Sequence, residues 1–281
     1  MNSALEREIE ISISGIRNLV EAVKEEHGFD LGCFAMTSFK RRVIKTLQKN
    51  EIGTIEVLTN KLVDDKLFFE KFLNDINVEC TEFFRDPAFW RYFRNDILPA
   101  LDKKQMQIKI WFPGCSSGEE VISGAIAIEE AGLKNKTKIL ATDISASIVD
   151  GLKNRTYSNN KFEISETNYQ RFNEEKADFS RYTVKEKNGF RIRDDIYENI
   201  DFNVYKYQDA QKIKGFNLVI CRNVFIYYTT QYQEMLLGLF AENLSYNGFL
   251  VIGAMEDISW CKDYYKFSEV NNSEKVYKRI G

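Results

Sequence analysis

The sequence contains very few of the residues on which histidine-based or metal-based catalysis depends. Histidine occurs once, at position 27, and no two cysteines form a CxxC pair. The five cysteines stand far apart, at Cys33, Cys80, Cys115, Cys221 and Cys261. A histidine base, a metal centre and a disulfide framework are therefore not expected. Unpaired cysteines of this kind favour a reduced cytoplasmic setting.

Long apolar runs and an excess of basic charge are also missing. No stretch approaches the ~20 apolar residues that cross a bilayer, and the acidic, amphipathic start does not resemble a secretory signal. The net charge is −3, so no global electrostatic case exists for nucleic acid. We expect neither membrane insertion nor a nucleic-acid partner. What the chain does have is 44% hydrophobic residues, including 21 Phe and 14 Tyr, which is ample for a buried core.

The first part of the chain shows helical periodicity. Apolar residues recur at helical spacing over 3–26, 37–49, 54–62 and 65–76. Gly28 supplies a stop for the first of these helices. The second helix carries a basic face, which consists of Lys40, Arg41, Arg42, Lys45 and Lys49. The pattern predicts an all-helical N-terminal domain over residues 1–78.

Strands and helices alternate after Asp86-Pro87, a pair typical of a helix N-cap and first helical residue. Strands are expected at 108–112, 138–142, 216–221 and 249–254, and helices at 118–132, 145–153 and 230–244. The alternation predicts an α/β domain over residues 79–281, with a mostly parallel sheet covered on both faces. The polar stretch 155–200 is expected to be an inserted subdomain. Two β-like runs, 264–270 and 275–280, are expected to form a hairpin at a sheet edge.

The stretch WFPGCSSGEE runs from a strand through a loop of small residues into a helix. Gly114 and Gly118 would allow backbone to approach a ligand at the carboxyl end of the strand. The spacing is not GxGxxG and no lysine follows, which argues against a nucleoside triphosphate. Glu119 and Glu120 would repel a phosphate and favour a cationic or hydroxylated ligand. The alternative is an ordinary strand-to-helix turn.

Asp143 follows the next apolar strand, about 25 positions after Gly118. An acidic residue there is how such folds hold ribose hydroxyls, although a helix N-cap is the common alternative. A glycine loop, an acidic residue for ribose and no phosphate clamp together suggest S-adenosylmethionine rather than NAD or ATP.

Two further segments contain candidate site residues. Arg222 and Asn223 come directly after the strand FNLVIC, at the sheet edge where ligands bind, and a structural salt bridge is the alternative. Arg85, in TEFFRDP, stands where the helical part joins the sheet. Ligand sites favour such junctions, and an ordinary surface charge is the alternative.

Taken in order, TEFFRDPAFW, WFPGCSSGEE, ILATDIS, FNLVICRNVFIYY and NGFLVIGAMEDI resemble the motifs of the CheR family, the chemotaxis receptor glutamate methyltransferases. The resemblance covers about residues 25–281. It implies a Rossmann-like class I methyltransferase sheet with an N-terminal helical domain and a small inserted β-subdomain. It also implies methyl transfer from S-adenosylmethionine to the side-chain carboxylate of glutamate in a protein, with S-adenosylhomocysteine as product and no metal.

The resemblance assigns roles to individual residues. It implies cofactor contacts for Thr81, Arg85, Glu120, Asp143, Arg222 and Asn223, to which the loop adds Gly114. Tyr227 matches the tyrosine near the methyl group. Since an arginine fork and a phenol can both steer a carboxylate, Arg85 and Tyr227 are the predicted catalytic pair.

The sequence departs from the family pattern at four positions. Glu79 replaces a polar residue, often Asn, Val121 replaces a proline, and Lys206 and Tyr207 stand where an Asn-Leu pair usually contacts adenine. Val121 and Lys206 prompt an alternative, a cofactor-binding regulatory scaffold without catalysis. A third interpretation is a small-molecule or nucleic-acid methyltransferase. The net charge, which is not basic, and the absence of an N/D-P-P-Y/F motif both argue against it.

The expected partner is an acidic helical protein that bears the methylated glutamate, as a receptor signalling bundle does. Arg41 and Arg42 on the basic helix face are the predicted recognition residues, because opposite charge steers association. The alternative is a solvated surface helix. The enzyme itself is expected to be a monomer.

Overall fold

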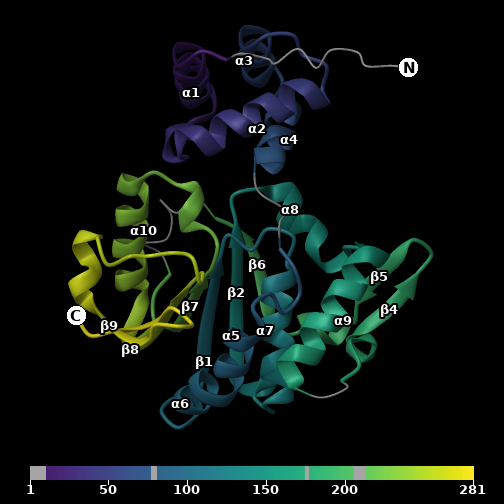
Figure 1. The fold of residues 1–281 in the computed structure, drawn as a ribbon, viewed down its shortest axis with the longest axis vertical. Helices are drawn as coiled ribbons and strands as arrows, with labels where there is room; N and C mark the ends of the chain where they lie inside the picture. Colours follow the sequence, from purple (N-terminus) through teal and green to yellow (C-terminus); the bar gives the residue numbers. More distant parts are fainter. Residues whose placement is uncertain (1–10, 77–80, 175–176, 206–212) are drawn as a thin grey trace. The chain divides into compact units, whose positions relative to one another are not determined.

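The computed structural model describes residues 11–76, 81–174, 177–205 and 213–281, which divide into two compact units (Figure 1). The helical unit comprises Met1–Asn77 and Ile226–Tyr232, and the sheet unit comprises Val78–Phe225 and Gln233–Gly281. The boundary expected between residues 78 and 79 lies outside the described residues. The helical unit also takes in a short segment, 226–232, that the sequence pattern had assigned to the α/β domain.

The helical unit contains the four helices that periodicity predicts. They are α1 (Ile13–His27), α2 (Met36–Lys49), α3 (Ile55–Asp64) and α4 (Lys66–Ile76). The stop after α1 is Gly28, whose φ of +62° is a conformation that glycine adopts without strain. The Thr54 side chain accepts a hydrogen bond from Val57 N, which caps α3. The expected part of the first helix before residue 11 lies outside the described residues.

The segment Ile226–Tyr232 attaches to the helical unit through backbone hydrogen bonds. Ala35 N donates to the Tyr227 carbonyl at 2.9 Å, and Thr229 N donates to the Cys33 carbonyl at 2.8 Å. Between these bonds Phe34 and Tyr228 form an antiparallel bridge, and their rings stack at 5.3 Å. Two backbone hydrogen bonds and this single bridge therefore hold the segment against the helical unit.

The sheet unit is built on a seven-stranded sheet in the order β6-β2-β1-β7-β8-β10-β9. Its strands are β1 (Ile108–Pro113), β2 (Thr137–Asp143), β6 (Ile200–Val204), β7 (Phe216–Cys221), β8 (Leu244–Ile252), β9 (Phe267–Asn271) and β10 (Val276–Arg279). The strands from β6 to β8 are parallel to their neighbours, and the hairpin β9–β10 adds antiparallel strands at one edge. The predicted α/β class and edge hairpin are confirmed.

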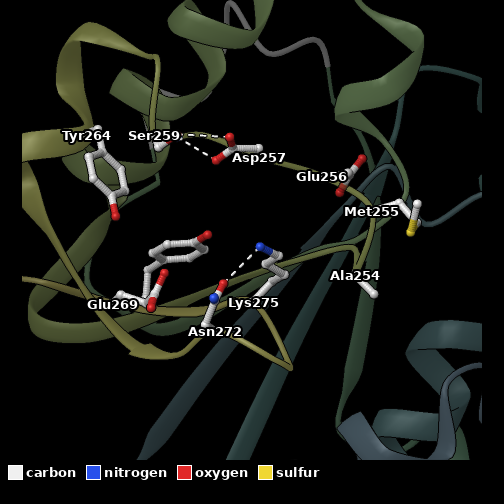
Figure 2. A pocket seen from close by; sticks show the side chains of 10 residues that line it. Ala254, Met255, Glu256, Asp257, Ser259, Tyr264, Glu269, Asn272 and Lys275 are labelled. Atoms are coloured by element: carbon white, nitrogen blue, oxygen red, sulfur yellow. Dashed lines mark hydrogen bonds between the residues drawn. The ribbon is translucent and has the colours of Figure 1, made fainter.

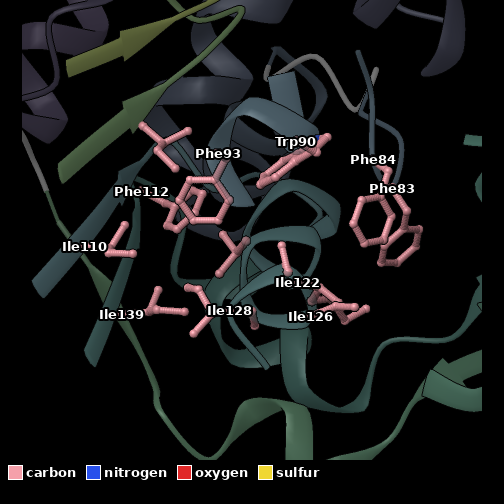
Figure 3. Close-up of a cluster of buried hydrophobic side chains, with 14 of the residues drawn as sticks. Phe83, Phe84, Trp90, Phe93, Ile110, Phe112, Ile122, Ile126, Ile128 and Ile139 are labelled. Carbon is pink, nitrogen blue, oxygen red and sulfur yellow. The ribbon is translucent and has the colours of Figure 1, made fainter. Parts of the chain in front are cut away.

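Helices pack on both faces of this sheet, as the alternation predicts. They are α5 (Pro87–Tyr92), α6 (Leu98–Asp102), α7 (Glu119–Glu130), α8 (Ala146–Gly151) and α10 (Thr230–Asn243). Ile110 and Phe112 of β1 join the core with α5 and α7 (Figure 3). Trp111 points the opposite way and contacts Phe240 of α10, with ring centroids 5.5 Å apart. The alternation of side chains along β1 therefore fills two cores.

The inserted region has more regular structure than its polar sequence suggests. A three-stranded antiparallel sheet, β3-β5-β4, contains β3 (Tyr157–Ser158), β4 (Thr183–Glu186) and β5 (Gly189–Ile192). A helix of 15 residues, α9 (Asn159–Asn173), follows β3. Neither α9 nor β6 was among the elements predicted from the sequence. No helix in the described ranges is long and apolar enough to span a membrane.

Candidate functional site

The register of β1 against β2 brings two of the predicted motifs together. Pro113 pairs with Thr142, so the loop after β1 begins beside the end of β2. The backbone N–H groups of Gly114 and Cys115 both donate to the Thr142 carbonyl, at 2.8 and 2.9 Å. Gly118 has a φ of +90°, and a Cβ there would lie 2.9 Å from the Leu152 side chain. The loop therefore requires glycine at this position.

Ser116, which the sequence reasoning missed, is the loop residue with an unusual environment. Its φ is +46°, a region that few residues other than glycine occupy. Its Oγ is buried and has no hydrogen-bond partner within the described part of the chain. A buried hydroxyl of this kind needs a partner, and a polar ligand can supply one. The available signal was its place between two glycines in a loop of small residues.

Asp143 fastens the loop to the end of β2. It is 5% exposed, and its Oδ2 accepts from Ser116 N at 2.9 Å while Oδ1 accepts from Ser145 N at 3.2 Å. Burial raises the pKa of Asp143, although the backbone donors oppose that rise. The N-cap of α8 is Ser145, whose Oγ accepts from Ile148 N. The alternative of Asp143 as a helix cap is therefore wrong.

The two glutamates at the start of α7 have different surroundings. Glu119 is fully buried and bonds to Ser117 Oγ and Lys161 Nζ. The Glu120 carboxylate pairs with Arg222 at 2.9 Å. Burial raises the pKa of Glu120 to about 6, against the opposing attraction of Arg222. Burial thus disfavours the charged form of Glu120.

Arg222, at the end of β7, joins three elements. Its Nη1 donates to Glu120 Oε1 of α7 and its Nη2 donates to Asp86 Oδ2 at 2.5 Å. The guanidinium also stands over the Phe89 ring, 4.4 Å from its centroid. The salt-bridge alternative for Arg222 is therefore present, and contact with a cofactor stays a prediction.

Asp86 occupies the expected N-cap position of α5, but its side chain does not cap the helix. Its φ is +57°, and its carboxylate bonds to Arg222 instead of to the helix backbone. The predicted N-cap position of Asp86 is confirmed, while its carboxylate pairs with Arg222 from a distant strand.

Asn223 lies on a sharp turn that the loop after β8 supports. Its φ is +58°, and its N–H donates to Glu256 Oε2 at 3.0 Å. Gly253 N donates to the same oxygen at 2.6 Å. A Cβ on Gly253 would lie 2.8 Å from Asn223 N, so this approach also requires glycine.

The TEFFR segment is anchored by its two phenylalanines. Phe83 and Phe84 are both fully buried, and Phe84 N donates to Ser123 Oγ at 2.8 Å (Figure 3). The Arg85 carbonyl accepts from Trp90 Nε1 at 3.0 Å. This anchoring fixes the backbone that carries Thr81 and Arg85, both of which are partly exposed.

A hollow of about 460 Å³ lies between the loop after β8 and the β9–β10 hairpin (Figure 2). Its lining includes Asp257, Tyr264, Glu269 and Lys275, and none of the predicted site residues. Glu256, which also lines it, is the residue that supports Asn223. No cluster of three or more metal-ligating side chains occurs among the described residues.

The structure corrects the interpretation of the basic helix face. Arg41 and Lys45 are exposed, whereas Arg42 is 8% exposed and faces the interior of the helical unit. Arg42 Nη1 donates to the Ile76 carbonyl at 2.5 Å, and its guanidinium lies over the Tyr227 ring at 4.5 Å. Arg42 therefore does not belong to the exposed surface that was predicted to recognise a partner.

The predicted cofactor residues belong to one unit, whereas the predicted catalytic pair is divided. Thr81, Arg85, Gly114, Glu120, Asp143, Arg222 and Asn223 all belong to the sheet unit. Tyr227 belongs to the helical unit, so its joint action with Arg85 stays a prediction. Lys206, Tyr207 and Glu79 lie outside the described residues.

Comparison with known proteins decides the family. Residues 79–274 match the family described as CheR methyltransferase, SAM binding domain. The chain belongs to the CheR methyltransferase family. A Pseudomonas putida protein carrying the name Cher3 is 31% identical over 94% of this chain and 96% of its own length. A Listeria monocytogenes protein named chemotaxis protein methyltransferase is 30% identical over 86% of this chain and 89% of its own.

Among solved structures, the CheR-family chain is similar to the N-methyltransferase NodS of Bradyrhizobium japonicum in complex with S-adenosyl-l-homocysteine. That likeness has a TM-score of 0.37 and 11% identity, over 68% of this chain and 87% of NodS. The assignment to the CheR family rests on the sequence matches.

The residues at the carboxyl edge of the sheet fit S-adenosylmethionine. Asp143 offers carboxylate oxygens of the kind that accept ribose hydroxyls, and Glu120, although paired with Arg222, offers carboxylate oxygens that can accept hydrogen bonds from an ammonium group. Ser116 adds the buried hydroxyl that lacks a partner among the described residues. The cofactor would therefore be held by β1, β2 and the first turn of α7.

Proposed function

We propose that this CheR-family methyltransferase transfers a methyl group from S-adenosylmethionine to the side-chain carboxylate of glutamate in a chemoreceptor-like signalling protein. The observation that supports this most directly is the cofactor edge. There Asp143 holds a loop that contains the buried Ser116 hydroxyl and no phosphate-binding lysine, and Glu120 follows in the first turn of α7. The name of the Listeria relative, chemotaxis protein methyltransferase, supports the choice of substrate class.

The proposed methyl transfer does not require an acid–base residue of the protein. S-adenosylmethionine, when bound, supplies a methyl group made electrophilic by the attached sulfonium. A glutamate carboxylate is already ionised at neutral pH and needs no general base to act as nucleophile. The single histidine agrees with this, because His27 stacks on Phe69 at 4.0 Å and its Nε2 is hydrogen-bonded to the Leu62 carbonyl. It is a packed residue of the helical unit.

The protein's contribution in this proposal is alignment and the exclusion of water. A solvated carboxylate is a poor nucleophile, so the site must strip water while holding the carboxylate in line with the methyl group. Arg85 and Tyr227 are the proposed donors to that carboxylate, Arg85 through two parallel N–H groups and Tyr227 through its phenol. Neither residue needs to change its protonation state.

The partner in this proposal is an acidic, helical protein, and the enzyme acts on it as a monomer in the cytoplasm. The exposed Arg41 and Lys45 of α2 are the proposed recognition residues, in place of the buried Arg42. Exposed basic side chains raise the rate of association with an acidic surface, and salt screens that effect.

Calorimetry with S-adenosylmethionine and S-adenosylhomocysteine tests cofactor use, and we expect both to bind. Methyl transfer is tested with cofactor radiolabelled on the methyl group and chemoreceptor signalling domains as substrate. Glutamate methyl esters hydrolyse in mild base and release labelled methanol, whereas methylated amines do not. Base-stable label would contradict carboxylate methylation, and cofactor binding without any transfer would favour the regulatory scaffold.

A further inference from the structure

Two residues of the inserted subdomain reach the cofactor loop. Tyr157, in β3, donates its hydroxyl to the Ser117 carbonyl at 2.9 Å. Lys161, in the first turn of α9, pairs with the Glu119 carboxylate and donates to the Thr81 carbonyl at 3.4 Å. The insert thus contacts both the loop after β1 and the segment that carries Thr81 and Arg85.

Glu119 is the centre of these contacts. Its side chain is fully buried, and its carboxylate accepts from Ser117 Oγ as well as from Lys161. A buried carboxylate needs a cation and hydrogen-bond donors, because removal from water is costly. Within the described residues Lys161 is the cation that pairs with Glu119. The Lys161 side chain is itself only 31% exposed, so water screens the pair weakly.

Ser117 is therefore held at two points by the insert. Its carbonyl bonds to Tyr157, and its hydroxyl bonds to Glu119, which Lys161 in turn holds. On either side of Ser117 the backbone is in the left-handed region, with φ of +46° at Ser116 and +90° at Gly118. A backbone in sparsely populated conformations persists only where its surroundings enforce it.

We infer that Lys161 and Tyr157 are positioning residues, through which the inserted subdomain presets the Ser116–Gly118 loop for the cofactor. The inference rests on the proposed use of this loop for S-adenosylmethionine. Neither residue needs to touch the cofactor, because both act through Ser117 and Glu119. A loop that already has its binding conformation loses less conformational entropy when the ligand binds. The affinity for the ligand is therefore higher. Weakening the insert's hold should therefore lower cofactor affinity without removing any cofactor contact.

The test compares S-adenosylhomocysteine affinity by calorimetry in four variants. Lys161→Met should weaken binding about tenfold, the effect of losing one charge-assisted hydrogen bond. Lys161→Arg, which keeps the charge, should recover most of the affinity. Lys153→Met is the matched control, because Lys153 is an exposed lysine close to the insert and should leave affinity unchanged. Tyr157→Phe should weaken binding by a smaller factor.

Two results would overturn the inference. One is a lower melting temperature for Lys161→Met with unchanged affinity, which would mean a purely structural role. The other is full recovery of affinity in Lys161→Met/Glu119→Gln, which would mean that Lys161 only neutralises a buried charge. We expect the double variant to regain stability but to keep weakened binding. The glutamine side chain that replaces Glu119 would have no lysine to hold it, and the bond to the Thr81 carbonyl would still be missing.

Amide hydrogen exchange on the ligand-free protein separates this inference from the proposed function. In Lys161→Met the amides of 116–118 should exchange faster than in the parent and in Lys153→Met. Unchanged exchange would overturn the positioning role. If the parent itself fails to bind S-adenosylhomocysteine, the proposed function fails, while the exchange result still decides whether the insert orders the loop.

Discussion

Each unit of the molecule buries one arginine among its described residues, and the two are stabilised in different ways. Arg222 of the sheet unit pairs with two carboxylates, Glu120 and Asp86. Arg42 of the helical unit bonds to a backbone carbonyl and lies over the Tyr227 ring, and its Nη2 is buried without a partner among the described residues. In the sheet unit, the buried charge is therefore neutralised, at the edge that holds the predicted cofactor residues. In the described part of the helical unit, no carboxylate neutralises the buried charge.

The difference shows what each arginine contributes. A paired buried charge adds directional hydrogen bonds and fixes the elements that carry its partners. Arg222 joins β7, α5 and α7 in this way, and so orders the edge where the cofactor is expected. An unneutralised buried arginine is costly, and burial accordingly lowers the pKa of Arg42. The contacts of Arg42 nevertheless connect α2 with the end of α4 and with Tyr227.

The largest expected effect is on the paired arginine. Arg222→Met should lower the free energy of unfolding by about 3 kcal/mol, because Glu120 would keep a largely buried charge without its cation. Urea unfolding measures the change, with Arg41→Met as an exposed control that should alter stability by less than about 0.5 kcal/mol. If Arg222→Met and Arg42→Met lower the free energy of unfolding equally, the proposed difference between the two units is wrong.

The second prediction asks whether the ordered edge binds the cofactor. Asp143→Ala should weaken S-adenosylhomocysteine binding by about 1–3 kcal/mol, the value of hydrogen bonds to a charged group. Asp143→Asn keeps one accepting oxygen and should lose less. Calorimetry on both variants decides the matter. If both bind the cofactor as tightly as the parent while the melting temperature falls, Asp143 serves only to fasten Ser116.

The third prediction uses the pH dependence of stability to test the raised pKa of Glu120, the carboxylate that pairs with Arg222. The pKa of Glu120 rises from 4.5 to about 6, so between these values the folded protein holds a proton that the unfolded chain has released. The resulting stabilisation, up to about 2 kcal/mol, is fully present below pH 4.5 and is lost as pH rises through 6. Glu120→Gln should remove this part of the pH dependence.

The measurement is the difference in unfolding free energy between parent and Glu120→Gln across pH 4.5–7. A difference is needed because Asp143 also has a raised pKa and contributes with the same sign. Parallel curves for the two proteins would show that Glu120 titrates normally and that its burial is unimportant.

Local sequence signals were sufficient for much of the sheet unit. The strands β1, β2 and β7 are short apolar runs followed by small or polar residues, so their ends and the site loops could be predicted together. A signal for α9 was also present, because Phe162, Tyr169 and Phe172 recur at helical spacing, but the surrounding polar residues obscured it.

Other features depend on contacts that no local pattern contains. Asp86 and Arg222 are 136 positions apart, and Glu119 and Lys161 are 42 apart. The burial of Arg42 belongs to the same class. Its neighbours Arg41 and Lys45 are exposed, and only the packing of α2 against α4 and the 226–232 segment turns this one arginine inward.

The fourth prediction tests the unneutralised arginine. Arg42→Met should change the free energy of unfolding by no more than about 1 kcal/mol, because the loss of one hydrogen bond and a cation–π contact is offset by relief of desolvation. Urea unfolding measures it beside Arg222→Met. A loss of about 3 kcal/mol or more would mean that the carbonyl and the ring stabilise the charge as well as two carboxylates do.

The smallest effect is expected where neither arginine is involved. Arg41→Ala/Lys45→Ala should leave unfolding and S-adenosylhomocysteine affinity unchanged, because both side chains are exposed on α2. Protein methylation should fall in low salt and approach the parent rate as salt is added, since steering by exposed charge is screened. Rates of methyl transfer at two ionic strengths measure this. Wild-type transfer in low salt would show that the exposed face of α2 is a solvated helix surface, and a salt-independent loss would indicate a direct contact rather than steering.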